Sequence, residues 1–188
     1  KEINHALATN YTERDRMRGS KYVESNLKGV FLTVKKQLED NNLVLFTGTP
    51  CQIDGLLSYL GGKSHNLILV DLLCHGVPSP AVFRSHLKYI EQKYNRKIVD
   101  YSFRSKKYGY EHTHVATFKS GRTDSSIDIK RIIRIFSLNV RESCYYCPYA
   151  SRNRVGDITI GDLWDSGNVI GLYDYRGSSL VLINSDTG

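Results

Sequence analysis

One stretch, Leu43–Cys74, constrains the fold of this chain more than any other. Two short apolar runs, LVLF and NLILVDLL, flank a segment with room for a short helix, Gln52–Leu60. Apolar runs of this length are typical of strands that are buried on both faces. Pro50 suits the first turn of a helix. Because a strand, helix and strand joined this tightly form a right-handed parallel unit, the sequence predicts an α/β fold.

Each of these two predicted strands is followed by a cysteine. Cys51 lies just past the first strand and Cys74 just past the second. The carboxyl ends of parallel strands lie at one edge of the sheet, which is where open α/β sheets bind ligands. We therefore expect Cys51 and Cys74 to be neighbours in space. The other two cysteines, Cys144 and Cys147, lie far downstream in the segment CYYC, and we expect all four to meet at one site.

Four thiolates satisfy either a tetrahedral zinc ion or an iron–sulfur cubane. Zinc ribbons usually use two CxxC pairs, whereas this chain has one pair and two single cysteines. Pro148 follows the last cysteine, as in some cluster-binding loops. A thioredoxin-like pair is disfavoured, because no strand pattern precedes Cys144 and no helical pattern follows it. Spacing alone favours a cluster and leaves zinc and inert core cysteines open.

The remaining patterns predict a mixed, largely parallel central sheet flanked by helices, with a small antiparallel insert. Leu27, Phe31, Val34 and Leu38 mark one face of an amphipathic helix, and Ser79-Pro80 has the composition of a helix start. Strand patterns cover Lys97–Arg104, His112–Phe118 and Thr123–Ile129 in the insert, and then Asp157–Ile160 and a buried run, Ser179–Asn184. We expect a short helix over Ile129–Asn139 and a loop-like stretch, Arg18–Tyr22, within the polar segment His5–Glu24.

Two short segments are candidates for contacts with a phosphate or a cofactor. The first is Gly19, Ser20, Lys21 and Tyr22, which combines small residues with a positive charge; a plain surface turn is the alternative. The second is Thr47, Gly48 and Thr49, whose hydroxyls and amides face the start of a helix; these residues also suit a simple turn of the chain.

Other polar residues near the cysteines carry weaker predictions. His75 is able to tune the site by hydrogen bonding, although a loop role is the simpler interpretation. His112 and His114 alternate on a strand and are expected to face solvent. Carboxylates for the site are available from Asp157, Asp162 and Asp165. The sequence identifies no catalytic residue.

Composition limits the function classes. The chain has 188 residues and a net charge of +7, which suits a basic surface or an anionic partner. The basic residues are scattered without a recognition motif, so nucleic acid is not an expected partner. No apolar run approaches the roughly 20 residues of a membrane span. Four cysteines without a signal-peptide pattern favour metal or redox chemistry in the cytoplasm over a disulfide scaffold. We expect a single domain over residues 1–188 that is a fragment of a longer chain, because both ends look cut.

The ordered motifs resemble the coenzyme F420 hydrogenase/dehydrogenase β-subunit family of iron–sulfur flavoproteins, in particular bacterial members associated with polysaccharide biosynthesis. The matching segments are GSKY (Gly19–Tyr22), LFTGTPCQIDGL (Leu45–Leu56), VDLLCHGVPSP (Val70–Pro80), FRSKKYGY (Phe103–Tyr110), CYYCPYA (Cys144–Ala150), GDITIGDLW (Gly156–Trp164) and GSSLVLIN (Gly177–Asn184).

The resemblance implies an oxidoreductase that binds FAD and a [4Fe-4S] cluster and passes electrons between a ferredoxin-type partner and a small-molecule substrate. The family's cluster cysteines fall on Cys51, Cys74, Cys144 and Cys147, and its flavin contacts near GSKY and TGTP. Archaeal relatives reduce coenzyme F420, and others reduce different substrates. The family's GDFWG reads GDLWD here, and its FRxKxGW reads FRSKKYGY; these departures bear on the substrate more than on the cluster. The family's Gly-rich flavin segment and ferredoxin module do not precede these motifs here.

Two other functions compete with electron transfer. The first is a zinc-stabilised α/β module that binds a partner without redox chemistry. The second is a protein of a polysaccharide pathway, such as a transferase, in which the cysteines are structural. The nature of the bound metal distinguishes these two functions from electron transfer.

Overall fold

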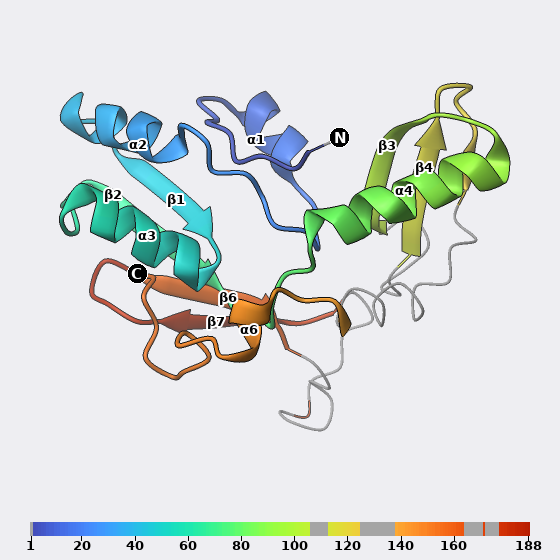
Figure 1. Cartoon of the computed structure of the whole chain (residues 1–188). Helices are drawn as coiled ribbons and strands as arrows, with labels where there is room; N and C mark the ends of the chain where they lie inside the picture. The colour runs from blue at the N-terminus through green and yellow to red at the C-terminus, as the bar shows by residue number, and fades with distance from the viewer. Residues whose placement is uncertain (1, 106–112, 125–137, 164–170, 172–176) are drawn as a thin grey trace. The chain divides into compact units, whose positions relative to one another are not determined.

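The computed structural model describes residues 2–105, 113–124, 138–163, 171 and 177–188. Contacts divide the chain into two compact units (Figure 1). Unit 1 is Lys1–Asn26 with Gly76–Tyr145, and unit 2 is Leu27–His75 with Tyr146–Gly188. Each unit has its own buried apolar residues. The single-domain interpretation of the sequence stays a prediction.

Unit 2 is built on a four-stranded sheet in the order β1-β2-β6-β7. Its strands are β1 (Val44–Gly48), β2 (Leu67–Leu72), β6 (Ile158–Asp162) and β7 (Ser179–Ile183). The first three strands are parallel, and β7 pairs antiparallel with β6. The helix α3 (Pro50–Leu60) connects β1 to β2. The predicted strand–helix–strand unit and the mixed, largely parallel sheet are therefore confirmed.

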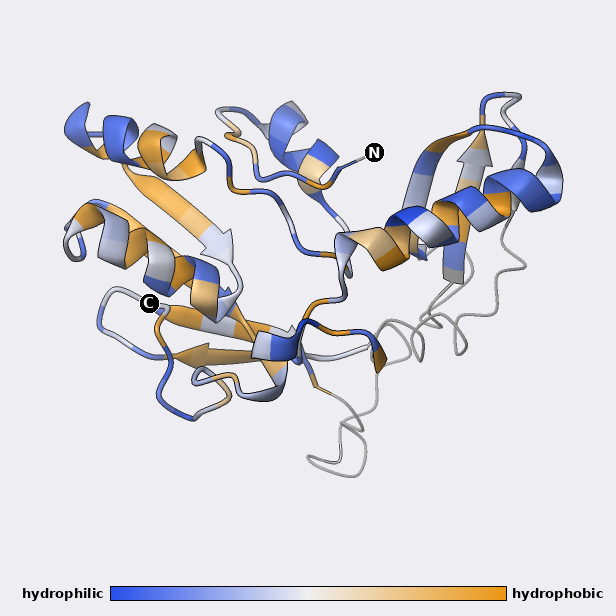
Figure 2. Cartoon of the chain, in the orientation of Figure 1, coloured by the Kyte–Doolittle hydropathy of each residue, from blue (hydrophilic) through white to orange (hydrophobic). Residues whose placement is uncertain are grey.

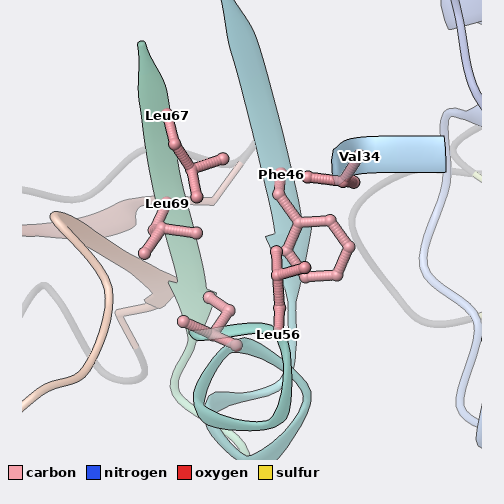
Figure 3. Packing of buried hydrophobic residues seen from close by; sticks show 6 residues of the cluster. Val34, Phe46, Leu56, Leu67 and Leu69 are labelled. Atoms are coloured by element: carbon pink, nitrogen blue, oxygen red, sulfur yellow. The ribbon is translucent and has the colours of Figure 1, made fainter. Parts of the chain in front are cut away.

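The core of unit 2 lies between this sheet and two helices, α2 (Val30–Glu39) and α3. Figure 3 shows buried side chains of both helices meeting those of β1 and β2. They are Val34, Phe46, Ile53, Leu56, Leu67 and Leu69. Burial of one such side chain contributes about 1.5–3 kcal/mol. This packing fixes the end of β1, the start of α3 and the end of β2 relative to one another.

The opposite face of the same sheet is apolar but exposed, which corrects two predictions. Leu45 on β1 is 60% exposed, so this strand is not buried on both faces. Val181 and Ile183 on β7 are 54% and 62% exposed, so the run Ser179–Asn184 is not a buried strand. Both strands lie at edges of the sheet, and Figure 2 shows their apolar character. The apolar pattern identified the strands correctly but could not tell which faces are covered.

Unit 1 contains the predicted antiparallel insert and the helix α4 (Pro80–Tyr94), whose N-cap is Ser79. Three strands, β3 (Ile98–Ser105), β4 (Thr113–Phe118) and β5 (Thr123–Asp124), pair antiparallel in sequence order. The unit also holds α6 (Glu142–Tyr145) and α1 (Tyr11–Met17). The stretch Arg18–Tyr22 lies outside helices and strands, as predicted. The helix α1 lies in the polar segment before it, and the Asn10 side chain caps this helix by accepting from the Glu13 amide.

His114 on β4 also differs from its prediction. Its side chain is fully buried and does not face solvent. The Tyr101 hydroxyl lies 2.7 Å from His114 Nδ1 and 2.9 Å from His86 Nε2, so one tyrosine links two histidines. Phe103 packs beside them. The predicted strand is present, but α4 and the aromatic side chains cover the face of β4 that carries His114.

Several predictions lie outside the described residues, wholly or in part. These are the helix over Ile129–Asn139, the second half of FRSKKYGY, His112, and the end of GDLWD, including Asp165. None of the helices in the described part of the chain has the length and apolar character that a membrane crossing requires.

Candidate functional site

Cys51 lies in the first turn of α3 and not in a loop before it. The helix begins earlier than the sequence predicted, because Pro50 takes its first position and the Gln52 side chain accepts a hydrogen bond from the Thr49 amide at 3.0 Å. The Cys51 thiol is exposed, and its Sγ lies 3.2 Å from Thr49 Oγ1. The thiol therefore lies at the N-terminal end of α3.

Cys74 follows β2; it is also exposed and forms no disulfide. The strands β1 and β2 pair in register from Val44 opposite Leu67 to Gly48 opposite Asp71. Cys51 and Cys74 are each the third residue after this last pair, Gly48 and Asp71. Both therefore leave the sheet at the same edge, as the parallel unit predicts.

Cys144 lies on α6 in unit 1, where it packs against the segment that follows Cys74. Gly76 has a φ of +107°, which L side chains rarely adopt. A Cβ at Gly76 would lie 3.1 Å from Val140 Cγ1 and 3.4 Å from Cys144 Cβ. The glycine of the CHG motif thus provides the space that lets Cys144 approach the chain two residues after Cys74.

Cys147 begins a loop that is bound to α3. We name residues 147–154 the Cys147 loop. Within it the Tyr149 hydroxyl donates a hydrogen bond of 2.6 Å to Asp54 Oδ2, three residues after Cys51 on α3. This hydrogen bond, burial, and the negative charges of Asp54, Cys51 and Cys147 raise the pKa of Tyr149 to about 12. The Tyr149 hydroxyl is therefore within electrostatic range of both thiols.

Arg154 ends the Cys147 loop and joins it to the end of β2. Its guanidinium donates to the backbone oxygens of Tyr149 and Ser151 in the loop, at 3.2 and 3.3 Å. It also donates to Asp71 Oδ1 at 2.9 Å and to the backbone oxygen of Leu72 at 2.8 Å. The loop that follows CYYC is thus held beside the residues that lead to Cys74. Sequence reasoning missed Arg154, Tyr149 and Asp54.

Asp157, a predicted carboxylate of the site, has a structural role. It is buried, accepts from the Leu69 amide at 2.9 Å, and pairs with Lys63 and Ser185. Burial acts to raise its pKa, but these hydrogen bonds outweigh burial and hold the pKa below its usual range. His75 is exposed in the loop after Cys74. Within the described residues, no three His, Cys, Asp or Glu side chains form a group that could hold a metal ion as they stand.

Comparisons with known proteins place the chain in a family. The sequence model of the coenzyme F420 hydrogenase/dehydrogenase β subunit, C terminus, matches residues 41–188, which is well over half of the chain. The chain belongs to this family. The region matched includes all four cysteines, the Cys147 loop and the strands that carry them. The resemblance that the motifs indicated is confirmed, and the family is one of hydrogenase and dehydrogenase subunits.

The fold agrees with this assignment. A chain of the F420-reducing [NiFe] hydrogenase complex from Methanosarcina barkeri matches with a TM-score of 0.54 at 16% identity. The match covers 98% of this chain and 62% of that chain, so this β-subunit homologue spans less than two thirds of its structural neighbour. At this identity the likeness shows the fold alone. No curated protein sequence matches the chain.

The surroundings of the cysteines in this β-subunit homologue leave them more available to a cofactor than the surroundings of the predicted flavin contacts do. None of the four cysteines forms a disulfide, Gly76 leaves room for Cys144, and the Tyr149 hydroxyl is near Cys51 and Cys147. In contrast, Lys21 Nζ donates to the backbone oxygens of Met17, Arg18 and Gly19, where it caps α1. The Thr49 amide is bound to Gln52. These two groups are engaged within the chain, so they offer no preformed phosphate site.

Proposed function

We propose that this chain is the electron-transfer part of an oxidoreductase and holds a [4Fe-4S] cluster through Cys51, Cys74, Cys144 and Cys147. In this function, electrons pass between a ferredoxin-type partner and a small-molecule substrate. One observation supports it above the others: the Cys147 loop is hydrogen-bonded both to α3, which carries Cys51, and to the end of β2, which leads to Cys74.

Chain connectivity extends this argument to the fourth thiol. Cys144 and Cys147 are only three residues apart, and Gly76, which packs against Cys144, is two residues after Cys74. The contact between Tyr149 and Asp54 therefore links the segments of Cys51 and Cys147, and the packing of Gly76 against Cys144 links Cys144 to the chain that follows Cys74. When bound, a cubane cluster would supply one-electron chemistry, with one thiolate on each iron. The role of this chain is to present the four sulfur ligands, and the Thr49 hydroxyl is placed to donate to the sulfur of Cys51.

FAD belongs to the proposal through the family resemblance and not through the contacts in this structure. Gly19, Ser20, Lys21 and Tyr22, with Thr47, Gly48 and Thr49, stay predicted flavin contacts. In this structure Lys21 and the Thr49 amide bind other groups of the chain. A role in polysaccharide biosynthesis and a cytoplasmic location stay predictions of the sequence.

Anaerobic purification tests the cluster directly. We expect a brown protein with broad visible absorbance and about four iron and four sulfide ions per chain. Cys51→Ser, Cys74→Ser, Cys144→Ser and Cys147→Ser should each abolish assembly, since each removes the ligand of one iron. A colourless protein that holds one zinc ion would instead support the zinc-stabilised binding module. A cysteine whose replacement leaves the iron content unchanged is not a ligand.

A separate measurement tests the flavin. Titration of the apoprotein with FAD should show binding that Lys21→Ala weakens, if GSKY contacts the phosphates. Lys28→Ala is a matched control, because Lys28 is an exposed lysine outside the motif. Equal affinity in both variants would show that Lys21 only caps α1. This result would leave the cluster proposal intact, because the two cofactors are measured independently.

A further inference from the structure

We propose that Tyr149 and Asp54 form a latch that holds the Cys147 loop on α3 and thereby controls how firmly the cluster is retained. This inference rests on the proposed function, since it assumes a cluster on Cys51 and Cys147. It assigns a positioning role, and neither side chain is proposed to touch iron.

The first argument is the place of the two residues. Asp54 is three residues after Cys51 on α3, so the two side chains lie on the same face of the helix, about one turn apart. Tyr149 is two residues after Cys147. Their hydrogen bond therefore joins the two segments that present these thiols, which are far apart in the sequence. No other side-chain hydrogen bond described between the Cys147 loop and α3 does this.

The second argument is the quality of the bond. At 2.6 Å between Tyr149 Oη and Asp54 Oδ2, the distance is that of a charge-assisted hydrogen bond from a hydroxyl to a carboxylate. Both residues are partly buried, so water competes for the bond less than at an open surface.

The third argument is that the latch complements a second anchor. Arg154 holds the backbone of the loop at Tyr149 and Ser151 from the side of β2. The Tyr149 side chain holds it from the side of α3. With Arg154 alone the backbone of the loop stays near β2, but the part that carries Cys147 is free to move away from Cys51. Removal of the latch should therefore loosen one cluster ligand without unfolding the loop.

The test is the rate at which an iron chelator removes iron from the anaerobically loaded protein. We expect Tyr149→Phe to lose iron about tenfold faster than the natural protein, the low end of the effect of a hydrogen bond to a charged group. Tyr146→Phe is the matched control, because Tyr146 lies in the same CYYC segment and is 85% exposed; its rate should not change.

Variants of Asp54, the acceptor, separate the effect of the hydrogen bond from the effect of the negative charge. Asp54→Ala should lose iron as fast as Tyr149→Phe, and the double variant should be no faster than either, because both remove the same interaction. Asp54→Asn keeps an oxygen that accepts from Tyr149 and should retain iron nearly as well as the natural protein. A merely destabilising role would instead lower the melting temperature of the apoprotein in parallel with iron retention.

The outcomes distinguish this inference from the proposed function. If the natural chain binds no cluster, the proposed function fails and the latch with it. If the natural chain binds a cluster and Tyr149→Phe releases iron at the rate of Tyr146→Phe, the latch is wrong while the cluster stands. If Tyr149→Phe does not fold, the comparison of Asp54→Asn with Asp54→Ala decides: equal release from both would overturn the latch.

Discussion

Arg154 Nη2 lies 2.9 Å from Asp71 Oδ1, and the two side chains are only 6% and 0% exposed. The pair is completed by other bonds, since Asp71 Oδ2 also accepts from the Gly156 amide at 3.0 Å and Arg154 Nε donates to Thr159 Oγ1. A buried charge of this kind is tolerated because its partners replace the water it has lost.

Arg154→Ala should therefore lower the free energy of unfolding by about 3–5 kcal/mol, because it leaves the Asp71 carboxylate buried without its cation. Urea denaturation measures the effect. Arg152→Ala is the control: Arg152 is an exposed arginine of the same loop, and its loss should cost less than about 0.5 kcal/mol. Equal stability of the two variants would show that the pair is not important for folding.

Gly76→Ala should destabilise the chain and impair cluster loading. The backbone at Gly76 is in a region that costs a residue with a Cβ about 1–2 kcal/mol, and the new methyl group would press on Val140 and Cys144. Gly121→Ala is a matched control, because Gly121 has a φ of +79° but nothing within 4 Å of its Cβ position. The control should be destabilised by a similar backbone cost and keep its iron; a loss of iron in both variants would contradict the packing argument.

Thr49→Val should lower the reduction potential of the bound cluster. The Thr49 hydroxyl lies 3.2 Å from Cys51 Sγ, and a donor to a ligand sulfur stabilises the more negative, reduced state. Valine keeps the shape and removes the donor, whereas Thr49→Ser keeps a hydroxyl and should preserve the potential. Spectroscopic redox titration measures both. An unchanged potential in the valine variant would show that the hydroxyl does not donate to this sulfur.

Stability should fall as the solution is acidified below neutrality, in part through His86. Burial lowers the pKa of His86 in the folded state, while the unfolded chain keeps a value of about 6.5. At a pH between these two values the unfolded chain binds more protons than the folded chain. The contribution of His86 to the free energy of unfolding is therefore full above a pH of about 6.5 and decreases as the pH falls toward the pKa of the folded state. The melting temperature of His86→Gln should depend less on pH from 7.5 to 5.5 than that of the natural protein. Identical pH profiles would contradict this assignment.

The sequence predicted the scaffold of the site well, because local patterns determine it. The apolar runs around Gln52–Leu60 defined a parallel unit, and its register brings the ends of β1 and β2 to one edge. The predicted start of α3, Gln52, was two residues late. The helix begins at Pro50, because the hydrogen bond from the Thr49 amide to the Gln52 side chain caps it there. Coverage of the sheet was also mistaken, because an apolar strand has the same pattern whether one face or both are buried.

The contacts that position the site were not predictable from spacing. Arg154 and Asp71 are far apart in the sequence, as are Tyr149 and Asp54, and each is an ordinary polar residue in its own segment. His114 shows the same limit: a histidine on an alternating strand suits solvent, and only the packing of Tyr101 and Phe103 makes it a core residue. Such long-range polar pairs depend on tertiary structure, which the spacing of residues within one helix or strand does not reveal.

The anchoring of the Cys147 loop affects what happens to the protein when it loses its cofactor. Among the described residues, Arg154 binds groups of the chain itself, from the carboxylate of Asp71 to the backbone of Leu72. The loop therefore takes its position when the polypeptide folds, whereas a zinc finger must wait for its metal before it folds. An oxidant that destroyed the proposed cluster would therefore leave the Cys147 loop folded. The damaged protein could then be repaired by assembly of a new cluster and need not be degraded.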